Sequence, residues 1–111
     1  MTGAARGAFH IEFRQEAQAD LRSLTADQRE RVRDGVQAFL LHQPDVEPKN
    51  RRRRRLRPNH VAGWRLRVDP LRVYYDIDAE TRTVTIQAVM IKDRGKLYRR
   101  GREVTLDERD D

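Results

Sequence analysis

The segment GWRLRVDPLRVYYDID, at residues 63–78, constrains the fold more than any other part of the chain. Apolar side chains occupy alternate positions on both sides of Asp69-Pro70, and a period of two is that of half-buried β-strands. Proline fixes its own φ and disfavours helix in the residue before it, so Asp69-Pro70 predicts a turn. We therefore expect a β-hairpin whose core-facing residues in the first strand are Trp64, Leu66 and Val68.

The same alternation assigns polar side chains to the other face of this hairpin. Arg65 and Arg67 fall between the apolar residues of the first strand, and Arg72 and Tyr74 between those of the second. Because successive side chains of a strand point to opposite faces, we expect these residues on a solvated side of the sheet. Three neighbouring arginines repel one another, and a planar guanidinium suits a phosphate, which favours an anionic ligand over a purely solubilising role.

The residues before the hairpin predict one strand followed by two helices. Residues 8–13, AFHIEF, alternate apolar and polar side chains, whereas residues 13–24 change to helical spacing. TADQ at residues 25–28 has the pattern of a capping box, which starts a second helix. Apolar residues follow in that helix at offsets 0, 4, 7 and 8 from Val32, and Pro44 is expected to end it.

The other segments carry weaker signals. Residues 44–60 contain three prolines and an arginine run without a period, which predicts a loop that is mobile when unbound. Residues 79–82 are expected to form a turn. TVTIQAVMI at residues 83–91 is expected to form a last strand that directs the following side chains to the core: Val84, Ile86, Ala88 and Met90.

This order of elements predicts an α+β fold. The N-terminal strand and the helical hairpin would pack on a mainly antiparallel four-stranded sheet as a two-layer sandwich, leaving the other sheet face open. At 111 residues the chain is expected to be one domain over residues 1–111, with residues 1–7 and 105–111 flexible.

Positive charge is concentrated between Lys49 and Arg72. Ten cations and the single anion Asp69 give this stretch a charge of +9, and because the whole chain carries +6, the remainder sums to −3. Such asymmetry indicates a polyanion-binding face. No amphipathic helix carries the cluster, which favours nucleic acid over a membrane surface.

Composition argues against several other classes of protein. The chain has no cysteine, and His10, His42 and His60 lack ligand spacing, so we expect neither disulfides nor a metal. No apolar run approaches the roughly 20 residues of a membrane span, and the N-terminus lacks the apolar region of a secretory signal. A soluble, cytoplasmic protein without a cofactor is expected.

Three segments together resemble the RelE/ParE family of bacterial toxins from type II toxin–antitoxin systems. They are the helical hairpin at residues 13–40, the β-hairpin at residues 63–78, and VTIQAVMIKDRGKLY at residues 84–98. The resemblance extends over residues 8 to about 104. It implies a cognate antitoxin as partner. In the RelE branch it further implies a metal-independent endoribonuclease that inhibits translation by cutting messenger RNA in the ribosomal A site.

The resemblance also implies site residues. The expected catalytic set is Arg65, Arg67, Arg72, Lys92 and Tyr98. The RNA-binding residues are expected to be Arg51, Arg52, Arg53, Arg54, Arg55, Arg57, Tyr74 and Arg94. The general base stays open between Lys92 and Tyr98, because an arginine does not readily release its proton.

Two other functions fit the same sequence. A ParE-like toxin would have the same architecture but would inhibit DNA gyrase, and the concentrated cations argue for RNA over a protein target. A non-catalytic nucleic-acid-binding protein would use the same face and the arginine run. Salt-sensitive RNA binding would fit both nucleic-acid functions, so affinity alone does not separate them.

Overall fold

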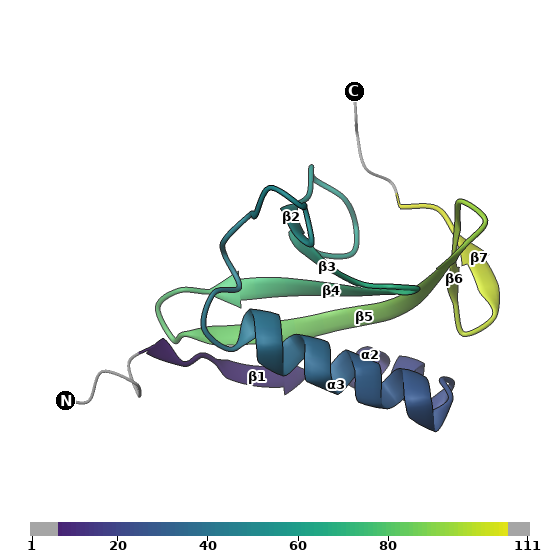
Figure 1. Cartoon of the computed structure of the whole chain (residues 1–111), viewed down its shortest axis with the longest axis horizontal. Coiled ribbons are helices and arrows are strands. Elements are labelled where there is room, and N and C mark those ends of the chain that lie inside the picture. The colour runs from purple at the N-terminus through teal and green to yellow at the C-terminus, as the bar shows by residue number, and fades with distance from the viewer. Residues whose placement is uncertain (1–6, 107–111) are drawn as a thin grey trace.

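The computed structural model describes residues 7–106, in which helices α2 (Gln15–Arg22) and α3 (Ala26–Leu40) cover one face of a β-sheet (Figure 1). The strands in these residues are β1 (His10–Phe13), β2 (Arg53–Arg55), β3 (Trp64–Val68), β4 (Leu71–Asp78), β5 (Thr83–Asp93), β6 (Lys96–Arg99) and β7 (Arg102–Val104). Neighbours in the order β2-β3-β4-β5-β6-β7 are antiparallel, and β1 pairs with β5 in parallel.

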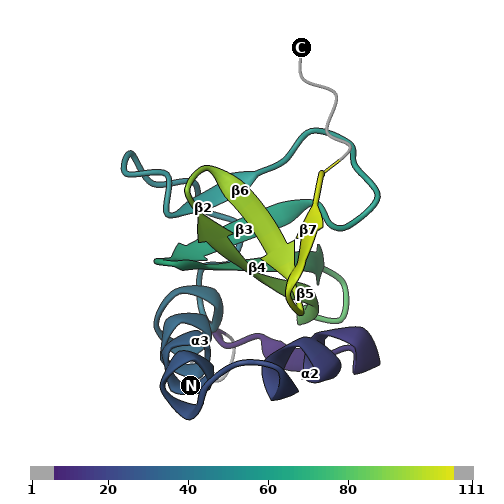
Figure 2. The same cartoon turned by 90° about the vertical axis from the view of Figure 1, so that its right-hand side faces the viewer.

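The α+β fold is confirmed, with both helices on the same side of the sheet (Figure 2). Seven strands replace the expected four within the described residues. The expected flexible ends fall largely on residues 1–6 and 107–111, which lie outside the described residues. The assignment of residues 1–111 to one domain stays a prediction. No helix within residues 7–106 is long and apolar enough to cross a lipid bilayer.

The predicted capping box starts α3. The Thr25 hydroxyl oxygen accepts from the Gln28 amide at 3.1 Å, and the Gln28 side chain accepts from the Thr25 amide at 3.0 Å. These two bonds satisfy amides that a helix N-terminus otherwise leaves unpaired. The predicted stripe of α3 is buried at Val32, Val36 and Leu40, so the helix packs on the sheet as expected.

Gly35 brings α3 close to β3. A Cβ at this position would lie 2.6 Å from Cγ2 of Val68, a distance that real Cβ contacts do not show. The glycine weakens the helix by about 1 kcal/mol relative to alanine, but it lets the helix backbone approach the sheet.

The main core lies between the helices and the sheet. The β3–β4 hairpin has the predicted register, with Leu66 opposite Val73 and both side chains fully buried. Buried Tyr75 donates its hydroxyl to the Pro44 carbonyl oxygen at 2.6 Å, which ties β4 to the segment after α3. Burial raises the pKa of Tyr75 above its ordinary value.

A β-bulge changes the predicted facing of β5. The register between β4 and β5 shifts between Tyr74 and Tyr75, so that β5 contains one extra residue, Gln87. An extra residue reverses the alternation beyond it. Val84 and Ile86 therefore lie in the main core as predicted, but the prediction is wrong for the next two inward residues, which belong to a second cluster on the other face: Ala88 and Met90.

The face expected to be open is partly covered by this second cluster. Its buried residues are Leu56, Ala62, Tyr74, Ala88 and Met90, and Val61, Leu97, Val104 and Leu106 pack against them. The expectation that Tyr74 is solvated is wrong, because 1% of it is exposed. The cover comes from the segment after β2 and from the β6–β7 hairpin, which the sequence patterns did not predict.

The predicted loop at residues 44–60 contains strand β2, so the expectation of an irregular segment is wrong there. Beyond β2, the Leu56 amide donates to the Gly63 carbonyl oxygen at 2.8 Å and closes a compact loop. The Asn59 side chain makes four hydrogen bonds of 2.8–3.0 Å inside it. Uniformly charged strands show no apolar alternation, so β2 left no periodic signal.

Strands β6 and β7 follow two tight turns that the sequence analysis missed. Arg94 and Gly95 have φ values of 52° and 82°, and Arg100 and Gly101 have φ values of 51° and 82°. Positive φ at both central residues is the type I′ geometry of two-residue hairpins. The repeated Arg-Gly pairs, flanked by short alternating segments, were the available signal.

Candidate nucleic-acid interface

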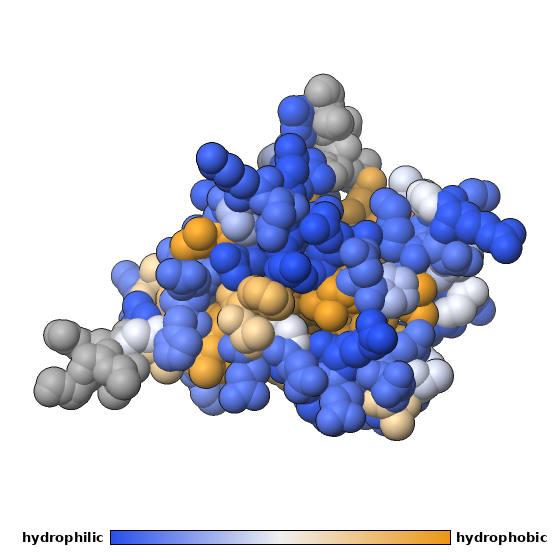
Figure 3. Space-filling view, viewed as in Figure 1, coloured by the Kyte–Doolittle hydropathy of each residue, from blue (hydrophilic) through white to orange (hydrophobic). Residues whose placement is uncertain are grey.

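Four arginines gather on the sheet face opposite the helices, and we call Arg54, Arg65, Arg67 and Arg72 the sheet-face arginines. Arg54 lies directly opposite Arg65 across β2 and β3, and Arg67 lies opposite Arg72 across β3 and β4. Directly opposite residues share one face of a sheet. Hydrophilic residues cover the molecule where β2 and the segment after it lie in Figure 1 (Figure 3).

These arginines have few internal anionic partners. Arg72 Nη1 pairs with Asp69 Oδ1 at 2.9 Å, and Arg67 Nε lies 3.6 Å from Asp69 Oδ2. Arg65 Nη2 and Arg67 Nη2 donate to the backbone carbonyl oxygens of Arg51 and Asn50, at 3.0 and 3.2 Å. Within residues 7–106, Asp69 is the one carboxylate that pairs with this cluster, so positive charge remains in excess.

Arg65 lies at the centre of this excess. Its Nε is buried and has no hydrogen-bond partner in the described structure. Burial lowers the pKa of Arg65, and the neighbouring guanidinium groups of Arg72 and Arg54 lower it further. A buried unpaired donor is costly, so an anion that accepted from this cluster would relieve both the repulsion and the missing hydrogen bond.

Lys92 and Tyr98, the two expected catalytic residues of the C-terminal part, lie on opposite faces of the sheet. Lys92 is exposed and is paired with Leu97, which packs on the second cluster, so Lys92 belongs to the face of the sheet-face arginines. Tyr98 is paired with Ile91, which packs against the main core on the opposite face. Both side chains line a cavity of about 340 Å³ at the sheet edge. The register therefore brings Lys92, but not Tyr98, to the arginine face.

The arginine run divides into exposed and structural residues. Arg53, expected to bind RNA, is 8% exposed and donates to the carbonyl oxygens of Val46 and Phe39 at 2.8 and 3.1 Å. Its guanidinium is thus committed to the helical side, which corrects the solvated position expected for it. The Arg52 guanidinium lies 4.6 Å from the centre of the Phe39 ring. The exposed residues of the predicted RNA-binding set are Arg51, Arg55, Arg57 and Arg94.

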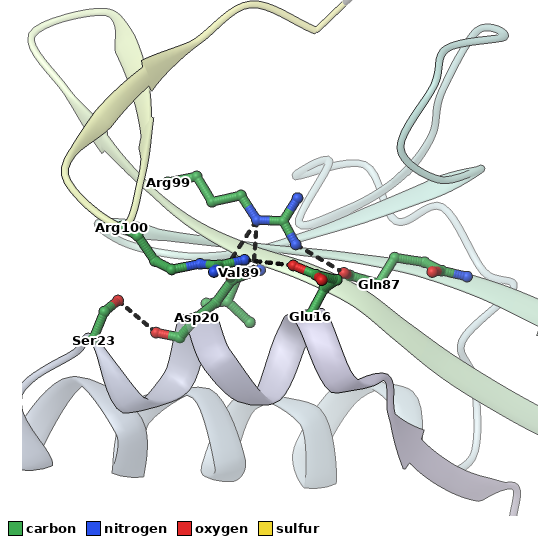
Figure 4. Close-up of polar contacts among 7 residues, drawn as sticks. All are labelled: Glu16, Asp20, Ser23, Gln87, Val89, Arg99 and Arg100. Atoms are coloured by element: carbon green, nitrogen blue, oxygen red, sulfur yellow. Dashed lines mark hydrogen bonds and ion pairs between the residues drawn. The ribbon is translucent and has the colours of Figure 1, made fainter.

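A second arginine cluster, which sequence reasoning missed, surrounds Asp20 (Figure 4). We call Arg99 and Arg100 the hairpin arginines. Asp20, 1% exposed, accepts from Arg99 Nε at 2.9 Å, from Arg100 Nε at 2.7 Å and from the Val89 amide at 2.9 Å. Arg100 Nη2 also pairs with Glu16 at 2.7 Å. The available signal was a carboxylate beside the apolar stripe of α2.

The Asp20 network replaces strand pairing along one edge of β5. On this edge β1 pairs with residues 83–86 and β6 with residues 91–93, which leaves a gap between them. Asp20 accepts the Val89 amide in this gap, and Arg99 Nη2 donates to the Gln87 carbonyl oxygen at 3.3 Å. Helix α2 and the β6–β7 hairpin are thereby locked to β5.

The described residues give less support to a metal site. Within residues 7–106, no group of three or more His, Cys, Asp or Glu side chains is arranged to hold a metal ion. The arrangement of the site is instead that of cations gathered around a small anion.

A protein-family model described as the ParE toxin of type II toxin–antitoxin systems matches residues 11–95. The chain belongs to the ParE toxin family. The resemblance to RelE/ParE toxins is thus confirmed, and the protein is a toxin of a type II toxin–antitoxin system. The match includes β2, β3, β4 and β5, so it covers all four sheet-face arginines together with Lys92.

Two solved structures have the fold of this toxin. One is the toxin–antitoxin complex RelBE2 from Mycobacterium tuberculosis, with a TM-score of 0.63 and 24% identity over 77% of this chain and 92% of that chain. The other is the archaeal RelE–RelB complex from Pyrococcus horikoshii OT3, with a TM-score of 0.62 and 16% identity over 78% and 98%. No curated protein matches the toxin's sequence.

Proposed function

We propose that the toxin is a ribosome-dependent messenger RNA endoribonuclease, which cleaves without a metal ion and so inhibits translation. The observation that carries this proposal is the excess of guanidinium groups on one sheet face, with Asp69 as their carboxylate partner among the described residues. Planar guanidinium groups bind phosphate oxygens in pairs of hydrogen bonds.

In this mechanism the ribose 2′-hydroxyl attacks the neighbouring phosphorus. A cyclic phosphate forms, the bond from phosphorus to the 5′-oxygen breaks, and negative charge grows on the pentacovalent phosphate. Arg65, Arg67 and Arg72 bind its oxygens and stabilise that charge. Removing one donor of this kind typically costs about 3–4 kcal/mol of transition-state stabilisation. Holding the 2′-hydroxyl in line supplies a further part of the rate.

Proton transfer is assigned to Lys92. A guanidinium stays protonated and does not act as a general base. Lys92 is exposed on the same face, two residue pairs beyond Arg72 towards the turn. As an ammonium group it donates a proton to the departing 5′-oxygen, while the attacking hydroxyl releases its proton to solvent. Tyr98 lies on the opposite face and takes no step in this mechanism.

An antitoxin is the proposed cellular partner. Both solved structures with this fold are toxin–antitoxin complexes. The toxin carries a charge of +9 between Lys49 and Arg72, which an acidic segment of a partner protein would neutralise. The antitoxin is accordingly expected to be acidic, and its binding to weaken as the salt concentration rises.

The test is cleavage of messenger RNA on translating ribosomes, mapped by primer extension. Wild-type toxin is expected to cut within codons with or without a chelator, and Arg72→Ala to cut about 100- to 1000-fold more slowly. Arg22→Ala removes the same charge from an exposed position on α2 and serves as the matched control. Cleavage that disappears with the chelator contradicts the metal-independent mechanism.

Inhibition of DNA gyrase is the second candidate, because the matching family model is that of the ParE toxin. A supercoiling assay with the same preparations separates the two functions. Intact messenger RNA together with blocked supercoiling would establish the gyrase function in place of the nuclease.

A further inference from the structure

A second basic hollow lies at the end of the sheet-face cluster. The loop at residues 56–63 and the adjoining ends of β2, β3 and β4 line an open cavity of about 570 Å³. The side chains that the proposal below uses are Arg55, His60, Trp64 and Asp76. Arg55 and His60 are exposed, so they are accessible to a ligand from solvent.

The cavity adjoins the sheet-face cluster at the end of β2 and β3. Arg55 directly follows Arg54 in β2, and Trp64 directly precedes Arg65 in β3. Arg55 and Trp64 are also opposite each other across the two strands. By strand alternation the side chains of Arg55 and Trp64 point to the helix side of the sheet, away from Arg54 and Arg65. A polyanion bound to the sheet-face arginines would therefore enter the cavity by turning around the end of β2 and β3.

The walls of the cavity are held in place before any ligand binds. Asn59 is saturated by four hydrogen bonds within the loop, and the Leu56 amide closes the loop on Gly63 at 2.8 Å. The Gly63 amide donates to Asp76 Oδ1 at 2.7 Å, which fixes the loop to β4. A preformed site loses less conformational entropy on binding than a mobile loop does.

Its groups match the parts of a nucleotide. Arg55 and His60 offer N–H donors to a phosphate. Trp64, whose ring stacks on Tyr75 with centroids 6.0 Å apart, offers a fixed aromatic wall to a base. Each oxygen of Asp76 accepts one bond, from Gly63 or from Gln87, and retains a lone pair for an exocyclic amine.

We propose that this cavity binds one nucleotide of single-stranded RNA adjacent to the bond that the sheet-face arginines hold. Its phosphate contacts Arg55 and His60, and its base lies against Trp64 with an amino group towards Asp76. The assignment rests on the proposed function only in taking RNA as the ligand. The site selects the sequence next to the cut and contributes to RNA affinity, and it takes no part in bond breaking.

The test uses the fluorescence of Trp64, which is the single tryptophan of the chain. Titration of the full-length toxin with a mixed-sequence RNA hexanucleotide, without ribosomes, is expected to give saturable quenching. Arg55→Ala and His60→Ala are each expected to raise Kd about three- to tenfold. Arg55→Ala should also lower the slope of log K against log salt by about 0.7, the value for one phosphate contact on a single strand.

Arg22→Ala, on α2, is the matched control and should leave both Kd and slope unchanged. In the ribosomal assay, Arg55→Ala and His60→Ala should raise KM without changing kcat. Far-UV circular dichroism checks that both variants remain folded.

Several results would overturn the assignment. RNA binding seen by anisotropy with no change in Trp64 fluorescence would place the RNA elsewhere. Wild-type affinity for RNA in both Arg55→Ala and His60→Ala would show that neither side chain contacts the phosphate. Equal quenching by inorganic phosphate at the same concentration would show an anion site without base binding. Quenching that persists in a toxin that cuts no messenger RNA would overturn the nuclease and leave the nucleotide site standing.

Discussion

The hairpin arginines and the sheet-face arginines are built from the same side chain but have opposite surroundings. Arg99 and Arg100 meet two carboxylates, of which Asp20 is 1% exposed and accepts from both. Of the four sheet-face arginines, Arg67 and Arg72 pair with Asp69, which is exposed. In the folded chain each hairpin arginine therefore has a carboxylate partner. We propose that an anionic ligand supplies the partners that the sheet-face arginines lack.

This difference shows that the number of carboxylate partners distinguishes arginines that stabilise the fold from arginines that are available to bind a ligand. Guanidinium groups that meet a buried carboxylate stabilise the fold, since breaking such a pair leaves a buried charge uncompensated. Guanidinium groups that crowd together without anions cost stability, and such clusters are typical of sites that bind anionic ligands. The comparison predicts that substitutions in the two clusters affect different properties.

The largest effect is expected at Asp20. Asp20→Ala leaves both hairpin arginines and the Val89 amide without their acceptor, and should lower the free energy of unfolding by about 3–5 kcal/mol. Urea denaturation followed by circular dichroism measures this change. A loss below about 1 kcal/mol would show that the network is not what holds the β6–β7 hairpin and α2 to β5.

A reciprocal pair of variants sharpens the comparison. Arg67→Ala should reduce messenger RNA cleavage about 100-fold or more while changing the unfolding free energy by less than about 1 kcal/mol. Arg100→Ala should do the reverse, with reduced stability and unchanged cleavage by the folded fraction. Equal loss of cleavage in both variants, measured on translating ribosomes, would erase the distinction between the clusters.

A smaller effect is expected when the repulsion between the guanidinium groups of Arg54 and Arg65 is relieved. Arg54 lies opposite Arg65 and contributes to the lowered pKa of Arg65. Arg54→Ala should therefore leave the unfolding free energy within about 0.5 kcal/mol of wild type, or raise it slightly. A loss of 2 kcal/mol in thermal or urea unfolding would mean that Arg54 has a structural partner.

The smallest effect concerns pH. A hydrogen bond from Arg100 holds the pKa of Glu16 below its ordinary value of 4.5. The folded state therefore binds this proton less readily than the unfolded state, so the contribution of Glu16 is present above pH 4.5 and is lost as pH falls through the folded pKa. Glu16→Gln should be slightly less stable than wild type at neutral pH, and the difference should vanish in acid. A gap that stays constant down to pH 3 in unfolding curves would contradict this.

Local patterns were sufficient to predict the helical half and the β3–β4 hairpin. The Thr25 capping box, the stripe of α3 and the turn at Asp69-Pro70 each depend on neighbouring residues alone. The facing of Arg65, Arg67 and Arg72 followed from strand alternation, and the structure has all three on one sheet face.

The missed features depend on contacts between distant residues. The bulge at Gln87 is set by how β5 meets both β4 and the Asp20 network, and no pattern within β5 reveals it. Strand β2 forms by backbone pairing with β3, although its side chains are all charged. Asp20 lies 79 residues from Arg99, so their pairing becomes visible only in the folded chain.

The most direct test of the account observes the arginine side chains themselves. Nitrogen-edited NMR resolves the Nε–H signals of individual arginines, assigned by single substitutions, during titration with a short single-stranded RNA. The account predicts saturable shifts for Arg54, Arg65 and Arg67, and none for Arg99 and Arg100, which Asp20 already occupies. Unmoved sheet-face signals at RNA saturation, or shifts confined to the hairpin arginines, would contradict it.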